Sequence, residues 1–151
     1  MNINYLKKIF ILLILHTGAS KVALSEDIPY LLSASGKGDL ETVQAIIESG
    51  GDPNTADKDN VSALMYAARK NQFAIADYLI SKGANINDAE EDGWTALMYA
   101  AKKNHIEVIK ILLANKADPK ITDPDGWSAY GLAATSGYHE TIELLIKDGI
   151  N

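Results

Sequence analysis

The sequence predicts an all-α solenoid of stacked helix-turn-helix units whose connecting segments end in β-turn tips. Two observations lead to this fold class. A 33-residue period runs through the chain, and residues 57–89 match residues 90–122 at 11 of 33 positions without a gap. Within each period, apolar residues recur at helical spacing between turn-forming dipeptides. One unit is too short to bury its own apolar faces, so neighbouring units must stack to form a continuous core.

Composition limits the classes of protein that remain. The chain has 151 residues, of which 47% are hydrophobic, and its net charge is −6 at pH 7. These values fit one globular domain and do not fit a disordered chain. The absence of cysteine excludes disulfide frameworks, cysteine metal sites and thiol nucleophiles. Because the balance is acidic, we expect no nucleic-acid partner.

Residues 1–25 have the layout of a secretory signal peptide that is removed from the mature protein. A basic start without acidic residues precedes an unbroken apolar run at residues 9–15, and small residues follow. Small side chains at Ala23 and Ser25 favour cleavage after Ser25, and cleavage after Ser20 is the alternative. An uncleaved membrane anchor is the other alternative, but the uncharged stretch of 12 residues is short of the roughly 20 that a spanning helix needs.

The remaining segment, 26–151, is predicted to be one repeat domain that folds outside the cytoplasm, as a periplasmic or secreted protein. No stable membrane span is expected once the signal peptide has been removed. The 33-residue step divides the segment into four units, at about 26–56, 57–89, 90–122 and 123–151. The first unit diverges most from the others.

Each unit is expected to begin with a turn and a first helix. Turn dipeptides recur at 33-residue steps, at Asp59-Asn60, Asp92-Gly93 and Asp125-Gly126. A hydroxyl residue follows each turn at the position of a helix N-cap, namely Ser62, Thr95 and Ser128. The first helix then runs for about nine residues and ends at a residue type that tolerates a left-handed backbone. These ends are Gly38, Asn71, Asn104 and Gly137.

The second helix of each unit places apolar residues at helical spacing, as at Phe73, Ala76, Leu79 and Ile80. Glycine closes this helix in the first, second and fourth units, and Asn115-Lys116 replaces it in the third. Paired alanines in the first helices allow neighbouring units to approach closely. The last helix has no following unit, so we expect it to fray or to act as a contact surface, including weak self-association.

The repeat resembles that of ankyrin-repeat proteins. The similarity rests on the segment Asp92-Gly93-Trp94-Thr95-Ala96-Leu97, on the alanine pair at 100–101, and on Ile111-Leu112-Leu113. The family has Pro-Leu-His after the threonine, whereas this chain has Ala-Leu-Met twice, so we expect turns that are held more loosely. The repeated Ala-Leu-Met-Tyr-Ala-Ala resembles bacterial members. The resemblance implies a non-catalytic module that binds a protein partner through the turn tips and the concave face of the first helices.

The tips and first helices supply the candidate protein-binding residues. At the tips these are Val61, Trp94 and Trp127. At the first helices they are Arg69, Lys70, Lys102 and Lys103. We expect the tryptophans to anchor a partner whose acidic segment lies on the basic stripe. The alternatives are that the tryptophans pack against neighbouring turns and that the lysines are merely solvated.

No catalytic motif occurs in the sequence, and we expect no enzyme activity, cofactor or metal site. A surface metal or cofactor carrier that uses His105 and His139 is one alternative, although the ligand set is incomplete. Two further alternatives within the binding class are a secreted effector that binds a host protein and an accessory or chaperone-like factor for an envelope enzyme.

Overall fold

The structure is a computed structural model that describes residues 28–150; the predicted signal peptide and its cleavage sites lie outside these residues. The described part contains eight α-helices, a terminal π-helix and no extended strand, which confirms the predicted all-α solenoid. The elements are α2 (Ile28–Lys37), α3 (Leu40–Glu48), α4 (Ala63–Arg69), α5 (Phe73–Ser81), α6 (Ala96–Lys102), α7 (Ile106–Ala114), α8 (Ala129–Ser136), α9 (His139–Leu145) and η2 (Ile146–Ile150).

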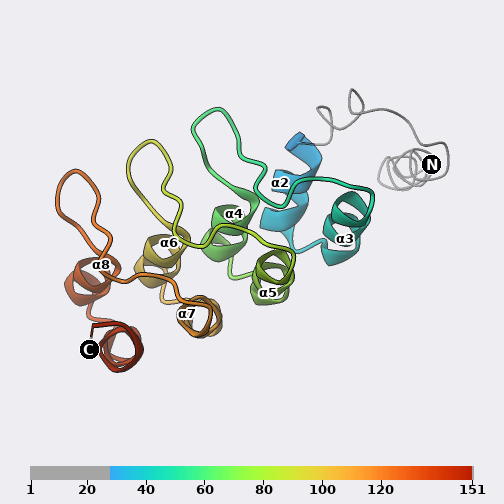
Figure 1. The fold of residues 1–151 in the computed structure, drawn as a ribbon. Helices are drawn as coiled ribbons and strands as arrows, with labels where there is room; N and C mark the ends of the chain where they lie inside the picture. Colours follow the sequence, from blue (N-terminus) through green and yellow to red (C-terminus); the bar gives the residue numbers. More distant parts are fainter. Residues whose placement is uncertain (1–27, 151) are drawn as a thin grey trace.

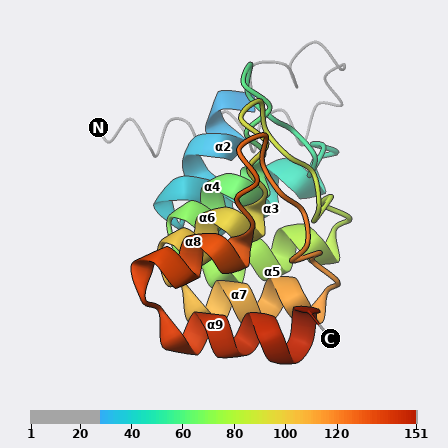
Figure 2. The same cartoon turned by 90° about the vertical axis from the view of Figure 1, so that its left-hand side faces the viewer.

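The helices form two rows. The first helices of the units, α2, α4, α6 and α8, pack side by side in chain order, and the second helices α3, α5, α7 and α9 form the other row (Figure 1). The segments that join successive units project beyond the row of first helices, all in the same direction (Figure 2). No helix among the described residues has the length and apolar character needed to cross a membrane.

The predicted caps set the bounds of the first helices. The hydroxyl oxygens of Ser62, Thr95 and Ser128 accept hydrogen bonds from the backbone N–H three residues later, at 3.3, 3.3 and 3.2 Å. At the other end, the backbone turns left-handed at Asn71 and Asn104, with φ of 59° and 58°. Asparagine and glycine tolerate this conformation best, and both ends therefore fall where the sequence predicts them.

The core lies between the two rows. The alanine pairs of α4 and α6 are 0% exposed, and their small side chains allow the first helices to pack closely. From the second row, Leu79 and Leu112 are likewise fully buried. Because each unit contacts only its neighbours, the core is a continuous strip along the stack rather than a single centre.

Asparagine side chains join the first three units to one another below the tips. Asn54 accepts a hydrogen bond from the backbone N–H of Asn85 at 2.7 Å and donates to the carbonyl of Gly83 at 3.2 Å. Thirty-three residues later, Asn87 makes the same two bonds, to Asp118 at 2.7 Å and Lys116 at 3.3 Å. These repeated bonds fix the spacing of the tips that follow.

Candidate protein-binding surface

One carboxylate organises each tip, buried at Glu90 and Asp123 and half-buried at Asp57. Asp57, Glu90 and Asp123 stand 33 residues apart, two positions before each turn dipeptide. Each accepts two backbone N–H groups of its own tip at 2.8 to 3.1 Å. An isolated antiparallel bridge then closes each tip. The sequence analysis missed this role, although an acidic residue at a fixed distance before each turn was the signal.

Left-handed residues complete the same tips. Asn60 has φ of 62°, and Gly93 and Gly126 have φ of 82° and 83° at the corresponding positions. A side chain at Gly93 would also place its Cβ 2.8 Å from the ring of Pro124 in the next tip. The tips therefore pack against one another and are held by their own carboxylates, without the histidine of the family pattern.

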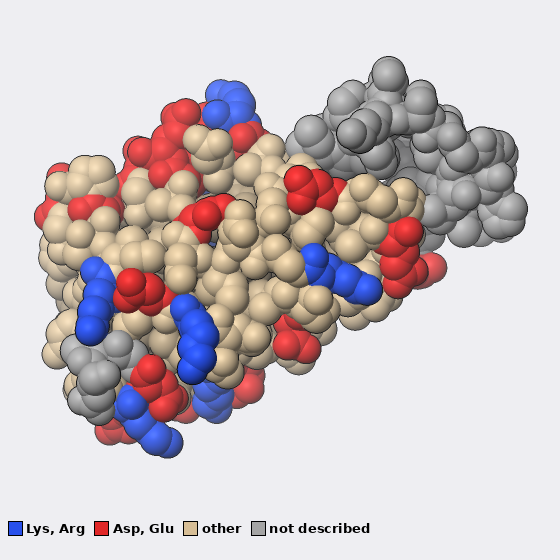
Figure 3. Space-filling model, viewed as in Figure 1, with Lys and Arg blue, Asp and Glu red and all other residues tan. Residues whose placement is uncertain are grey.

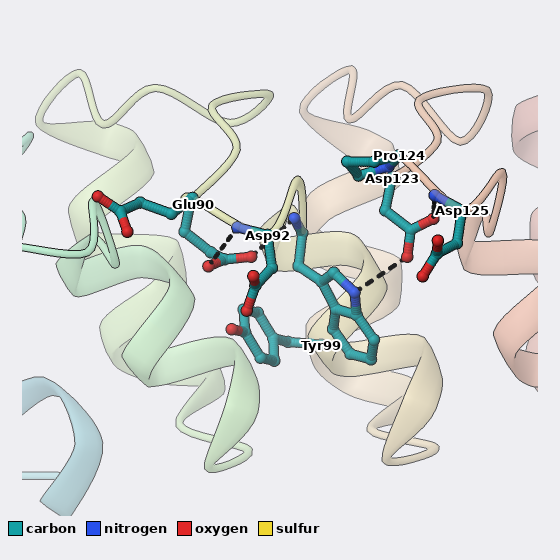
Figure 4. Close-up of a pocket in the computed structure, with 8 residues that line it drawn as sticks. Glu90, Asp92, Tyr99, Asp123, Pro124 and Asp125 are labelled. Carbon is teal, nitrogen blue, oxygen red and sulfur yellow. Dashed lines mark hydrogen bonds between the residues drawn. The ribbon is translucent and has the colours of Figure 1, made fainter.

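Trp94 joins two successive tips. Its indole Nε1–H donates to Asp123 Oδ2 of the next unit at 3.2 Å. Its ring lies against Tyr99 of α6, with the centroids 5.2 Å apart and the planes inclined by 55°. Figure 4 shows Tyr99 and, in the following tip, Asp123. Trp94 is half-buried, so it has a structural role and still presents part of its ring to the surface.

The other two candidate tip residues differ sharply from each other. Trp127 is 43% exposed, and its ring rests over Gly131, 3.2 Å from the place a Cβ would occupy. Val61 is only 9% exposed and belongs to the hydrophobic core. The expectation that Val61 faces outward at its tip is therefore corrected: it packs inward where the equivalent Trp94 reaches across the surface.

The basic stripe is placed at the C-terminal ends of two first helices. Arg69 ends α4 and Lys102 ends α6, and each is followed by a lysine at the C-cap. Cations are stabilised there by the helix dipole. Lys70, Lys102 and Lys103 are exposed, whereas Arg69 is half-buried, with its guanidinium carbon 5.0 Å from the Tyr66 ring centroid and 5.8 Å from that of Tyr99.

An acidic hollow of about 520 Å³ lies between the tips of the third and fourth units (Figure 4). Its aromatic wall is Trp94 and Tyr99, and its lining contains five carboxylates and neither lysine nor arginine. The carboxylates are Glu90, Glu91, Asp92, Asp123 and Asp125. Figure 3 shows acidic side chains gathered over the row of tips.

The hollow affects the hydroxyl of Tyr99. Burial raises the pKa of this phenol, and the negative charge of Glu90 raises it further. Arg69 opposes the shift without reversing its direction. The negative charges of Asp92 and Asp57 also raise the pKa of Tyr99.

The two histidines do not form a shared site. His105 begins α7, where its Nδ1 lies 2.9 Å from the carbonyl oxygen of Ala68 in the preceding unit. His139 is exposed at the start of α9. Within residues 28–150 no group of three or more His, Asp or Glu side chains could hold a metal ion.

Comparison with known proteins agrees with this architecture. A family model described as ankyrin repeats (3 copies) matches residues 31–123 and again residues 88–151. The two matches together span nearly all of the described residues. No curated protein matches the chain.

Proposed function

The chain belongs to the ankyrin-repeat family, and on this premise we propose that it is an exported, non-catalytic module that binds a protein partner through its turn tips and the concave face of its first helices. Ankyrin repeats indicate a protein–protein interaction module in general terms. The choice of face for this chain rests on the residues of its own surface.

The main support for the tips is their rigidity. Each of the three tips is held by a carboxylate that accepts its backbone N–H groups, and asparagine bonds between units fix the spacing in the first three units. The tips therefore present their outer residues in a fixed row. A preordered surface loses little conformational entropy when it binds. Trp127 is the most exposed candidate on this row, and aromatic side chains of this kind often anchor interfaces.

The two charge signs on the surface give the partner an orientation. The tips are acidic, and the stripe formed by Arg69, Lys70, Lys102 and Lys103 is basic. We propose that an acidic segment of the partner lies on the stripe while Trp127 packs into the partner. Complementary charge steers association and sets register more than it adds affinity.

Affinity capture with mass spectrometry tests the surface. The wild-type segment 26–151 is compared with Trp127→Ala and with Lys102→Glu, Lys103→Glu, each checked for equal helicity. We expect either change to weaken capture by about tenfold or more. Phe73→Ala is the matched control, because Phe73 is 52% exposed on α5, in the other row. Equal loss with the control variant, or full retention by both surface variants, would contradict the proposed surface.

Export is the second part of the proposal and is supported by the leader-like residues 1–25. Intact-mass analysis of the exported protein is expected to give an N-terminus at Glu26. An intact Met1 would instead indicate an uncleaved anchor. Cell fractionation then distinguishes a periplasmic protein from a released one.

A further inference from the structure

We infer that the acidic hollow between the tips of the third and fourth units receives the cationic group of an arginine or lysine side chain from the partner protein. The inference rests on the proposed function in one respect, namely that the partner is a protein that approaches the tips. It adds a contact of opposite charge to the one proposed for the basic stripe.

The aromatic wall of the hollow is already in place. Trp94 is fixed at its indole nitrogen by Asp123, and its ring is braced by Tyr99 at 5.2 Å. Both rings are half-buried and line the hollow. Aromatic faces attract guanidinium and ammonium groups, most strongly when the ring is tryptophan and the site is partly shielded from water.

The carboxylates of the hollow have no cation of their own. Among the described residues, the ion pairs are Lys58 with Asp59 and Lys110 with Glu107, and neither involves the hollow. Glu90 and Asp123 are 7% and 8% exposed and are oriented by backbone N–H groups. The charge is therefore fixed before any ligand arrives, and three further carboxylates stand exposed at the rim.

The chain itself uses this chemistry one unit earlier. Arg69 places its guanidinium over Tyr66, which lies 33 residues before Tyr99. In the next unit the residue equivalent to Arg69 is Lys102, and no cation–aromatic contact of Lys102 with Tyr99 occurs in the described structure. Arg69 reaches Tyr99 from α4, whereas Trp94 extends toward the following unit. The side of the aromatic pair that faces the acidic rim remains open to a cation from outside.

The hollow fits a side chain better than a metal ion. The most buried carboxylate oxygens already accept backbone and indole hydrogens, and aromatic carbon provides no ligand atom for a hard cation. A volume of about 520 Å³ is large for one ion and suits the planar end of an arginine. Arginine can in addition form paired hydrogen bonds with carboxylates.

An NMR titration of the purified protein tests the inference directly. The probe is the blocked peptide acetyl-Gly-Gly-Arg-Gly-Gly-amide, compared with its citrulline counterpart, which has the same shape without the charge. The chain has two tryptophans, so its spectrum contains two indole N–H signals, and Trp127→Phe assigns them. We expect a saturable shift of the Trp94 signal, with the Trp127 signal as an internal reference. The citrulline peptide should bind at least about tenfold more weakly than the arginine peptide. Addition of about 0.5 M salt should weaken the binding of the arginine peptide.

Two double variants with the same net charge distinguish binding in the hollow from attraction to the overall negative charge of the protein. Asp92→Asn with Asp125→Asn removes two rim charges that accept no hydrogen bond in the structure, and we expect about tenfold weaker binding. Asp77→Asn with Glu143→Gln removes two exposed charges from α5 and α9 and should leave binding unchanged. Equal responses to the arginine and citrulline peptides, or equal loss in both variants, would overturn the inference. Partner capture that survives such a result would leave the proposed function standing.

Discussion

Single residues in the left-handed region show where this chain departs from the ideal repeat. Gly50 and Gly83 close their second helices with φ of 98° and 93°, and Lys116 occupies the corresponding place with φ of 70°. A residue with a Cβ loses roughly 1 to 2 kcal/mol in this conformation. The third unit is therefore strained at one identifiable position.

Replacing that lysine should stabilise the protein. For Lys116→Gly we expect the free energy of unfolding to rise by about 0.5 to 1 kcal/mol, because the relief of strain exceeds the added entropy of the unfolded chain. Urea denaturation measures the change. Gly83→Ala is the converse control: a Cβ there meets open space, so strain alone should lower stability by about 1 kcal/mol. If Lys116→Gly lowered the free energy of unfolding, the lysine side chain would contribute more stability than its backbone strain removes.

A second residue-scale prediction concerns alkaline pH. Burial raises the pKa of the Tyr66 hydroxyl above its usual 10.0, and the hydrogen bond to Asp57, 2.9 Å long, raises it further. The unfolded chain then releases this proton at a lower pH than the folded one. The stabilisation is complete below pH 10 and is lost as pH rises through the folded-state pKa.

Tyr66→Phe should therefore make stability less dependent on pH above 10. Thermal unfolding followed by circular dichroism between about pH 8 and pH 11.5 tests this, with Tyr130→Phe as the control because Tyr130 lies on the exposed side of α8. If the unfolding temperature changed with pH in the same way for the wild type and Tyr66→Phe, the raised pKa of Tyr66 would not contribute to stability.

At the scale of elements, each tip hairpin depends on one carboxylate more than on its turn dipeptide. Asp123 accepts bonds from the backbone of Asp125 and Trp127 and from the indole of Trp94. It thus holds its own tip and binds the preceding tip to it. The neighbouring Asp125 accepts no such bonds and is exposed.

Asp123→Ala should lower the free energy of unfolding by about 2 to 3 kcal/mol, since three partly buried donors lose their acceptor. The Trp94 indole N–H should also exchange faster with solvent. Asp125→Ala removes the same charge and should change stability by less than about 0.5 kcal/mol. If the two variants were equally stable, the tip would not depend on the buried carboxylate.

Two of the second helices, α5 and α7, have a side-chain bond to the preceding unit in place of a local N-cap. Gln72 and His105 stand at the N-caps of α5 and α7, yet neither side chain caps its helix. Gln72 donates instead to the carbonyl of Gly36 at 3.3 Å, and His105 Nδ1 lies 2.9 Å from that of Ala68. These two helices lack the stabilisation of a side-chain N-cap, and the same side chains instead fix the position of their unit against the preceding one.

For the whole molecule, stability follows from contacts between nearest neighbours along the stack. The interior units pack against a unit on each side, while within residues 28–150 α9 and η2 pack against their own unit and the preceding one. Ile146 at the start of η2 is 43% exposed, although the preceding Leu145 is fully buried. Within residues 28–150, the fourth unit therefore combines contacts to one neighbouring unit with an exposed apolar side chain.

We expect this end to open first and to support weak self-association. Amide hydrogen exchange should be faster in α9 and η2 than in α6 and α7. Sedimentation at rising concentration should detect a weak oligomer that Ile146→Glu reduces and Phe73→Glu does not. A monomer at every concentration, with α9 as protected as α6, would contradict both expectations.

The sequence by itself determined the repeat, the helix pairs, the serine and threonine caps and the left-handed residues at helix ends. These features depend on local backbone chemistry that recurs every 33 residues, so one chain displays each of them several times. Only the tertiary structure decided which tip residues face outward. Val61, Trp94 and Trp127 occupy equivalent positions, yet one is buried, one bridges two tips and one is exposed. Their environments depend on the residues that the adjacent unit supplies, and a pattern within one repeat does not contain that information.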